Sequence, residues 1–396
     1  VTGGTRLSGE LRVQGSKNSS LPILAATILS GKKSLIKDVP NINDVDVMVE
    51  IMRILGADVT RYGNIIEVDS ANICSFEVPE HLMRKMRSSI ILMGAILGRF
   101  GKVRVSYPGG CEIGPRPIDL HLKGLAMMGV DMQERHGFIY AETKQLKGAD
   151  IHLDFPSVGA TENLMLAGVL AKGQTIIRNA AKEPEIVDLQ NFLNKMGANI
   201  KGAGTDTIKI EGVKVEDLDD VKEYIIIPDR IAAGTYLVAA AITRGDITLT
   251  NVVPEHLAPV LAKLREIGCK ITYHGEKIQL DTGQHLKAIE SLRTLPYPGF
   301  PTDMQAPMMA LLTTVDGTSV LTETVFENRF KHAEELRRMG AHITINGSTA
   351  IIRGVKKLTG AIVEAKDLRA GAALVIAALA ADGETRIYGV NYVERG

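Results

Sequence analysis

The chain has 396 residues, of which 45% are hydrophobic, and its 46 basic residues balance its 46 acidic residues. This length suits two or three domains with ample apolar core, so extensive disorder is not expected. A chain without net charge is a poor candidate for general nucleic-acid or membrane-surface binding. Any anion that it binds must therefore be held by locally placed basic groups.

The three cysteines, Cys74, Cys111 and Cys269, are odd in number and far apart. This arrangement argues against a disulfide framework and favours a reducing, cytoplasmic compartment. No signal peptide or apolar run of membrane length is visible. The nine histidines and the cysteines have no metal-ligand spacing, and no P-loop or dinucleotide-binding glycine motif occurs. The sequence therefore predicts no metal site and no nucleoside-triphosphate or Rossmann site.

The chain repeats a pattern in which a glycine precedes a short β-branched run. It occurs at Gly31, Gly101, Gly173, Gly245, Gly317 and Gly383, with spacings of 70, 72, 72, 72 and 66 residues. A second marker, a Leu, Met or Ile followed by glycine, occurs at Gly56, Gly129, Gly197, Gly268 and Gly340. A fixed period of this size indicates a repeated supersecondary unit. The sixth repeat lacks the second marker, so we expect the natural protein to continue by about one helix and strand pair.

Each repeat has the same predicted elements in the same order. A leading strand is expected, for example at 11–14, 151–154 and 224–227. An apolar helix follows, at 21–29, 90–97, 163–170, 231–242, 304–312 and 370–379. These helices are apolar on nearly every face, which predicts that they are buried all round. A strand, an amphipathic helix and a hairpin complete the unit, with hairpin turns at 62–64, 136–137, 204–206, 274–276 and 346–348.

The unit is therefore βαβαββ, and six buried helices wrapped by strands suggest two lobes of three units each. The boundary is expected near Tyr224 to Pro228, halfway along the chain. The acidic stretch 216–223 is a candidate for the connection.

A loop rich in glycine and proline runs from Pro108 to Pro117. It has three glycines and three prolines in ten residues, so it is neither a helix nor a central strand. It carries Cys111, and Arg116 lies five residues on. A nearby guanidinium lowers the pKa of a thiol and makes it a useful acid or nucleophile. The alternative, that Cys111 is a small buried hydrophobe, is equally open from these residues alone.

Polar side chains stand at the start of every buried helix. They include Ser16 to Asn18, Arg84 to Arg87, Ser157 to Gly159, Asp229 and Arg230, Thr302 and Asp303, and Asp367 to Arg369. Helix N-termini attract anions, which favours substrates bearing phosphate and carboxylate groups.

Helix capping is the alternative explanation for Ser157, Asp229, Asp303 and Asp367, and it suffices for any one of them. Cations at these positions oppose the helix dipole, so a bound anion is the better explanation for Lys17, Arg87 and Arg369. His121 is expected to be a polar packing residue.

Several longer motifs share one resemblance. They are Gly15 to Asn18, Pro108 to Cys111 with Arg116 to His121, Ser157 to Thr161, Glu183 to Asp188, Phe300 to Ala306, Thr322 to Arg329, and Asp367 to Arg369. With these motifs the chain resembles, from about Gly4 to Gly396, the UDP-N-acetylglucosamine enolpyruvyl transferase family. The sister family, the shikimate-pathway enolpyruvyl transferases, is similar in fold but lacks the Pro108–Cys111 run and the 323–329 run.

The resemblance implies an α/β (α+β) fold: a two-lobed inside-out α/β barrel of six βαβαββ repeats of about 70 residues, the sixth incomplete. It places 17–226 in the first lobe, with the Cys111 loop, and 1–16 with 227–396 in the second lobe. It also implies transfer of the enolpyruvyl group of phosphoenolpyruvate to the 3-hydroxyl of UDP-N-acetylglucosamine, with release of phosphate, as the first committed step of peptidoglycan synthesis. The expected protein is a cytoplasmic monomer that uses no cofactor, binds neither nucleic acid nor membrane, and is a target of fosfomycin.

Residue roles are implied in the same way. Asp303 resembles the general base near the sugar hydroxyl. Cys111 resembles the loop thiol that acts as an acid and forms an adduct with phosphoenolpyruvate. Lys17, Arg116 and Arg395 resemble the clamp on phosphoenolpyruvate. The predicted substrate-binding residues are Asn18, Arg87, Arg116, Pro117, Ile118, Asp119, Leu120, Ser157, Val158, Gly159, Val325, Arg329, Asp367, Arg369 and Arg395. One departure is Phe155, with Pro156, where the best-known members carry a basic residue.

Two other functions compete with this one. The shikimate-pathway reaction on the same fold predicts activity with shikimate 3-phosphate, and the Cys111 loop argues against it. A non-catalytic paralogue that keeps the UDP-sugar site for regulation would be expected to have lost the base or the thiol, whereas Asp303 and Cys111 are both present.

Overall fold

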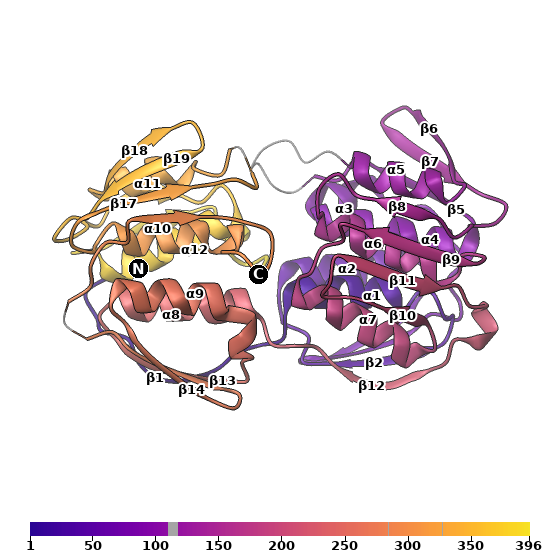
Figure 1. The fold of residues 1–396 in the computed structure, drawn as a ribbon, viewed down its shortest axis with the longest axis horizontal. Coiled ribbons are helices and arrows are strands. Elements are labelled where there is room, and N and C mark those ends of the chain that lie inside the picture. Colours follow the sequence, from indigo (N-terminus) through magenta and orange to yellow (C-terminus); the bar gives the residue numbers. More distant parts are fainter. Residues whose placement is uncertain (110–117, 284, 327) are drawn as a thin grey trace. The chain divides into compact units, whose positions relative to one another are not determined.

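The computed structural model describes residues 1–109, 118–283, 285–326 and 328–396. The chain divides into two compact units, each a mixture of helices and sheets (Figure 1). The first unit comprises residues 15–109 and 118–227, and the second unit comprises residues 1–14 and 228–396. Within the described ranges no helix is both long and apolar enough to cross a membrane.

The first unit has three sheets whose strands come from successive parts of the chain. Their orders are β12 (Val221–Ile225), β2 (Lys33–Lys37), β4 (Ile65–Asp69), β3 (Asp58–Tyr62); β5 (Lys102–Ser106), β7 (Phe138–Glu142), β6 (Asp131–Arg135); and β10 (Asn199–Lys201), β11 (Thr207–Glu211), β9 (Gln174–Arg178), β8 (Asp150–His152). Its helices are α1 (Lys17–Ala26), α2 (Asn43–Leu55), α3 (Glu80–Lys85), η1 (Arg87–Ile91), α4 (Leu92–Phe100), α5 (Asp119–Met127), α6 (Val158–Val169), α7 (Pro184–Met196) and η2 (Val215–Asp217).

The second unit follows a similar plan. Its sheets are β1 (Ser8–Arg12), β13 (Asp246–Thr250), β15 (Lys277–Asp281), β14 (Lys270–His274); β16 (Ser291–Arg293), β17 (Thr318–Thr322), β19 (Thr349–Arg353), β18 (His342–Asn346); and β20 (Ile362–Glu364), β21 (Arg386–Tyr388). Its helices are α8 (Arg230–Ile242), η3 (Pro254–Leu257), α9 (Ala258–Ile267), η4 (Thr302–Met304), α10 (Gln305–Leu312), α11 (His332–Arg338), α12 (Leu368–Ala380) and α13 (Val390–Val393).

All four four-stranded sheets share one pairing scheme. A leading strand runs parallel to the next strand in the sheet, and the remaining pairs are antiparallel. The parallel partner of β1 is β13, with Ser8 opposite Asp246 and Arg12 opposite Thr250. The antiparallel hairpins turn at the predicted places, for example between Tyr62 and Ile65 and between Asn346 and Thr349, so the five turn predictions are confirmed.

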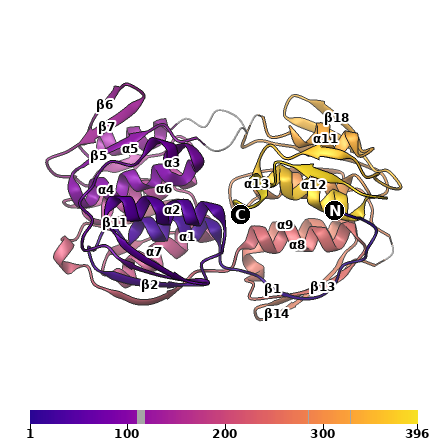
Figure 2. The same ribbon diagram turned by 180° about the vertical axis from the view of Figure 1, so that it is seen from behind.

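The six apolar helices are also confirmed, with shifted ends. Helix α1 starts at Lys17, four residues before the predicted start, because Ser16 caps it and Pro22 is accommodated inside it. Helix α6 likewise starts at Val158, behind the Ser157 cap. In the first unit α1, α4 and α6 lie among the strands (Figure 2). In the second unit α8, α10 and α12 pack on one another. Most of their side chains are buried, as their apolarity predicts.

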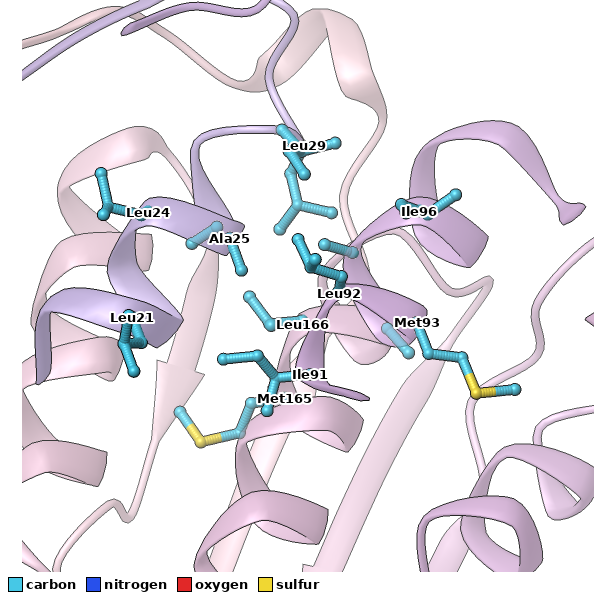
Figure 3. Close-up of a cluster of buried hydrophobic side chains, with 14 of the residues drawn as sticks. Leu21, Leu24, Ala25, Leu29, Ile91, Leu92, Met93, Ile96, Met165 and Leu166 are labelled. Atoms are coloured by element: carbon cyan, nitrogen blue, oxygen red, sulfur yellow. The ribbon is translucent and has the colours of Figure 1, made fainter. Parts of the chain in front are cut away.

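The core of the first unit shows how these helices meet. Leu21 and Leu24 on α1, Leu92 on α4, and Met165 and Leu166 on α6 belong to one cluster of buried side chains (Figure 3). Each is no more than 2% exposed. Full burial of such a side chain is worth about 1.5–3 kcal/mol, so this contact holds the N-termini of α1 and α6 in place.

One predicted connection is wrong. The acidic stretch 216–223 does not link the units, because it contains the end of η2 and the start of β12, which pairs with β2 inside the first unit. The chain passes from the first unit to the second at Ile227 and Pro228 instead.

Close packing of α4 on α6 gives a first testable prediction. A Cβ atom on Gly94 would lie 2.1 Å from the Asn163 carbonyl oxygen, and the Gly94 N–H donates to Asn163 Oδ1 at 2.5 Å. We expect Gly94→Ala to lower the free energy of unfolding by about 2–3 kcal/mol, because backbone atoms cannot move aside. Chemical denaturation measures this.

Gly98→Ala is the matched control on the same helix. Its added Cβ meets the end of the flexible Leu29 side chain at 3.2 Å, so we expect a change within about 1 kcal/mol. Equal losses for the two variants would contradict the proposed clash.

Candidate active site

A strongly charged site of the second unit is centred on Asp303, in the short helix η4. Its Oδ1 accepts a hydrogen bond from Arg329 Nη2 at 2.7 Å, and its Oδ2 accepts one from Arg369 Nη2 at 2.9 Å. The Arg329 side chain is 4% exposed and that of Asp303 is 26% exposed. Two guanidinium groups therefore hold an ionised carboxylate that solvent still reaches.

Two helix starts bring further carboxylates to this site. Asp229 caps α8 by accepting from Ile231 and Ala232 N–H, and Asp367 caps α12 by accepting from Arg369 and Ala370 N–H. Burial lowers the pKa of Arg369, but the charges of Asp303, Asp229 and Asp367 outweigh burial and raise it overall. Arg369 is therefore charged at every accessible pH.

A second carboxylate organises the loop beside Asp303. Glu323, just after β17, is 2% exposed and accepts from Val325 N–H at 2.8 Å and Phe326 N–H at 3.2 Å. It also accepts from the Thr302 hydroxyl at 2.9 Å. The predicted substrate residue Val325 is thus tied to the residue that precedes Asp303.

His332, at the start of α11, is a buried titratable group of the same unit. Burial lowers the pKa of His332 to about 4, with Arg329 acting in the same direction against the opposing charge of Asp367. The imidazole is therefore neutral at physiological pH, so it adds no positive charge near Asp303.

In the first unit the predicted cation Lys17 starts α1 and pairs with a buried carboxylate. Its Nζ lies 2.8 Å from Asp44 Oδ2 on α2, and the two side chains are 10% and 4% exposed. Asn18 follows on α1 and is half-buried. The pair holds the ammonium group at one place at the helix start.

The α6 start forms a second group of predicted residues. Ser157 caps α6 by accepting from Ala160 N–H at 3.3 Å, and Val158 and Gly159 are half-buried. A Cβ on Gly159 would lie 3.4 Å from His121 Nε2, so the histidine ring lies against the α6 start.

His121 on α5 is held by Asn163 on α6. Asn163 Nδ2 donates to the Ile90 carbonyl at 3.2 Å and to His121 Nδ1 at 2.9 Å, which leaves the ring proton on Nε2. Burial, followed by the charge of Arg87, lowers the pKa of His121 to about 4. The packing role predicted for His121 is confirmed, and Arg87 lies close enough to act on it.

The Glu183–Asp188 motif fixes α1 from the side of α7. Asp188 Oδ2 accepts from the Ser19 hydroxyl at 2.6 Å, and Asp188 Oδ1 accepts from the Tyr224 hydroxyl at 2.5 Å. Burial raises the pKa of Asp188 to about 6 in spite of these hydrogen bonds. The motif therefore supports the helix that carries Lys17 and Asn18.

Two expectations about the helix starts need correction. Asp303 is not an N-cap, because Pro301 precedes η4 and Met304 precedes α10 without side-chain capping bonds. A bound anion is also not needed to explain Lys17 and Arg369, because Asp44 and Asp303 pair with them. The cations remain at helix starts, with carboxylates of the chain itself as partners.

The remaining predicted residues fall into three groups. Cys111, Arg116 and Pro117 lie outside the described residues. Ile118 is buried, Leu120 is half-buried and Asp119 is exposed at the start of α5. Arg395 is half-buried just after α13, which packs on α12. Position 155 carries a phenylalanine and no basic side chain, and this phenylalanine is 43% exposed.

Sequence reasoning missed Asp44 and His332, and it did not assign a role to Glu323. Asp44 reads as an ordinary acidic residue in the first turn of an amphipathic helix, and nothing local pairs it with Lys17. Glu323 stands inside the 322–329 motif, so its position was a signal, but its partners Thr294 and Thr302 are distant in sequence.

The described residues contain no group of three or more His, Cys, Asp or Glu side chains arranged to hold a metal ion. What they do contain is an ionised carboxylate with two guanidinium partners in the second unit, and a buried ammonium at a helix start in the first. A carboxylate of this kind can accept a proton from an alcohol, and an ammonium can bind a phosphate.

Comparison with known proteins adds an independent line of evidence. The family model described as EPSP synthase (3-phosphoshikimate 1-carboxyvinyltransferase) matches residues 1–396. UDP-N-acetylglucosamine 1-carboxyvinyltransferase 2 of Caldanaerobacter subterraneus subsp. tengcongensis is 55% identical over 396 residues, covering 100% of this chain and 94% of the relative. UDP-N-acetylglucosamine 1-carboxyvinyltransferase 1 of Carboxydothermus hydrogenoformans is 54% identical, with coverage of 100% and 93%.

Among solved structures, the enolpyruvyl transferase NikO from Streptomyces tendae matches with a TM-score of 0.91 at 25% identity, covering 100% of this chain and 94% of that one. EPSP synthase from Acinetobacter baumannii matches in fold, with a TM-score of 0.73 at 20% identity and coverage of 99% and 94%. The expected relationship is thereby confirmed, and the chain belongs to the carboxyvinyltransferase (enolpyruvyl transferase) family, among the UDP-N-acetylglucosamine 1-carboxyvinyltransferases.

Proposed function

We propose that the protein transfers the enolpyruvyl group of phosphoenolpyruvate to the 3-hydroxyl of UDP-N-acetylglucosamine and releases phosphate. The observation that carries the proposal is the Asp303 carboxylate, held between Arg329 and Arg369. It stands in a chain that is more than half identical to named UDP-N-acetylglucosamine 1-carboxyvinyltransferases. The chain is accordingly a transferase of peptidoglycan synthesis.

Asp303 accepts the proton of the sugar 3-hydroxyl, and the oxygen then bonds to C2 of phosphoenolpyruvate while C3 gains a proton. The resulting tetrahedral ketal loses a proton from C3 and expels phosphate, which restores the double bond. Lys17, Arg116 and Arg395 bind the phosphate and carboxylate of phosphoenolpyruvate. Cys111 donates the proton that C3 gains, its thiolate takes up the proton that C3 of the ketal loses, and the thiol also forms an adduct with phosphoenolpyruvate.

The other predicted residues contact the UDP-sugar. Those from the first unit are Asn18, Arg87, Pro117, Ile118, Asp119, Leu120, Ser157, Val158 and Gly159, and those from the second are Val325, Arg329, Asp367 and Arg369. The α6 start supports this assignment, because Val158 and Gly159 are half-buried at a helix N-terminus, which favours a bound anion.

The proposal also covers the repeat architecture of the fold and the location, oligomeric state and partners of the enzyme. It takes the fold as six βαβαββ repeats in two lobes, 17–226 and 1–16 with 227–396. The parallel-then-antiparallel scheme of the four-stranded sheets supports this. The enzyme is a cytoplasmic monomer that works without a cofactor and binds neither nucleic acid nor membrane.

Phosphate release on mixing the protein with phosphoenolpyruvate and UDP-N-acetylglucosamine tests the function. Release that requires both substrates is the expected result. Release with shikimate 3-phosphate in place of the sugar nucleotide would favour the shikimate-pathway reaction. Binding of the UDP-sugar without any release would favour a regulatory paralogue.

The proposed role of Cys111 gives a separate prediction. Cys111→Ser is expected to slow turnover and to abolish covalent inactivation by fosfomycin, an epoxide that alkylates thiols, because the hydroxyl is a far weaker nucleophile. Mass spectrometry of the treated protein measures the adduct, with Cys74→Ser as the control because Cys74 is an exposed thiol. An adduct of unchanged yield on the Cys111→Ser protein would remove Cys111 from this role.

A further inference from the structure

The buried carboxylate of Glu323 contacts two different parts of the second unit. Its Oε1 accepts from the Thr294 hydroxyl at 2.7 Å and from the N–H groups of Val325 and Phe326. Its Oε2 accepts from the Thr302 hydroxyl at 2.9 Å. One oxygen therefore holds the turn at 324–326, and the other holds the residue next to Asp303.

The Thr302 hydroxyl links Glu323 to the catalytic carboxylate. A hydroxyl has one proton to donate, and here it is given to Glu323. Its lone pairs then accept from Arg329 Nη1 at 2.6 Å, while Arg329 Nη2 donates to Asp303 Oδ1 at 2.7 Å. Because the Arg329 guanidinium can only donate, the Thr302 oxygen accepts from it, and the Thr302 proton points to the Glu323 carboxylate.

We propose that Glu323 is a positioning residue for the Asp303 base, acting through Thr302 and Arg329. The inference rests on the proposed function, since it assigns Asp303 the role of base. Glu323 orients the Thr302 hydroxyl by accepting its proton. The Thr302 oxygen in turn fixes the orientation of the Arg329 guanidinium, and the guanidinium positions Asp303 Oδ1.

Holding the 324–326 turn does not by itself explain a carboxylate at this position. A neutral amide or hydroxyl oxygen can also accept from turn N–H groups. A buried negative charge costs several kcal/mol unless it is satisfied, and Glu323 is 2% exposed. At Thr302, by contrast, the partner has to be an acceptor that carries no proton. A partner that donated to the Thr302 oxygen would compete with the hydrogen bond from Arg329.

Thr302 offers a pair of variants that isolates this contact. Thr302→Val removes the hydroxyl and leaves Glu323 on the turn, whereas Thr302→Ser keeps the hydroxyl. We expect Thr302→Val to lower kcat for phosphate release about 10- to 100-fold, since a slightly misplaced base loses much of its effect. Its KM for the UDP-sugar stays within about threefold of the parent value, and Thr302→Ser restores kcat to within about threefold of it.

Glu323→Gln tests the charge itself. The amide oxygen can keep the turn, but the amide N–H₂ faces Thr302, so kcat is expected to fall about tenfold with little change in KM. Thr349→Val is the matched control, because it removes a threonine hydroxyl bond at 3.3 Å to Thr322 on β17 and touches no part of the Glu323 chain. Its kcat is expected to equal that of the parent.

Values of kcat within twofold of the parent for both Thr302→Val and Glu323→Gln would overturn the proposal. So would a raised KM with unchanged kcat in Glu323→Gln, which would limit Glu323 to the turn. If the parent itself released no phosphate, the proposed function would fail separately. The ¹³C signal of the Asp303 carboxylate would then decide: movement in Thr302→Val, without movement in Thr302→Ser or Thr349→Val, supports the link, and no movement refutes it.

Discussion

The Asp303→Asn protein is expected to release phosphate about 10³-fold more slowly than the parent, while it still binds UDP-N-acetylglucosamine. An amide is nearly isosteric with a carboxylate but cannot accept the hydroxyl proton, and a general base contributes about 10²- to 10⁴-fold to such a step. The loss should lie in kcat, because the sugar nucleotide keeps its other contacts. Steady-state kinetics and a titration with the UDP-sugar measure the two effects.

The same substitution is expected to reduce stability, and the two effects can be separated. Removing the charge leaves Arg329 and Arg369 without their shared partner, at a cost of about 2–3 kcal/mol given that the Asp303 side chain is 26% exposed. Asp382→Asn breaks an exposed ion pair with Lys357 and serves as the control, with an expected change below about 0.5 kcal/mol. A destabilised Asp303→Asn protein with full kcat would make Asp303 structural only.

Lys17→Met is expected to cost both stability and activity. The change leaves the Asp44 carboxylate, whose side chain is 4% exposed, without its ammonium partner at 2.8 Å. Breaking a buried pair from one side typically costs about 3–5 kcal/mol. We also expect kcat/KM for phosphoenolpyruvate to fall by at least about 10²-fold, since one charge-assisted contact to the phosphate is lost. Denaturation and initial-rate kinetics measure these changes.

The double variant Lys17→Met with Asp44→Leu distinguishes the two roles of Lys17. Replacing both charges with apolar groups removes the unpaired carboxylate, so most of the stability should return. The activity should not return, because the phosphate contact is still missing. Recovery of kcat/KM together with stability would show that Lys17 acts only through the fold.

The parts of the fold that depend on local pattern could be predicted from the sequence. The buried helices are apolar on all faces, and the hairpin turns carry glycine beside polar residues, so both were found at the right places. The helix starts were less accurate: Pro22 disfavours a helix locally, yet α1 includes it because tertiary packing buries its apolar side.

The parts of the site that depend on distant contacts could not be predicted. Lys17 and Asp44 are 27 positions apart in sequence and lie on different helices, so their ion pair follows only from the packing of α1 on α2. Capping and catalysis were both open for Asp303 from the sequence, and capping was excluded only by the helix starts at Pro301 and Met304 and by the contacts of Arg329 and Arg369 with its two oxygens. The same holds for Glu323, whose hydrogen bonds reach back to Thr294 and Thr302.

The pairing of β1 with β13 has a consequence for synthesis on the ribosome. Ser8 pairs with Asp246, and the two residues are 238 positions apart in sequence. At about 5–20 residues per second, β1 waits roughly 10–50 s for its partner strand to be made. An unpaired edge is then open to association with other nascent chains. The sequence of β1, Ser-Gly-Glu-Leu-Arg, has a glycine and two charges in five residues, so the waiting strand is a poor template for aggregation.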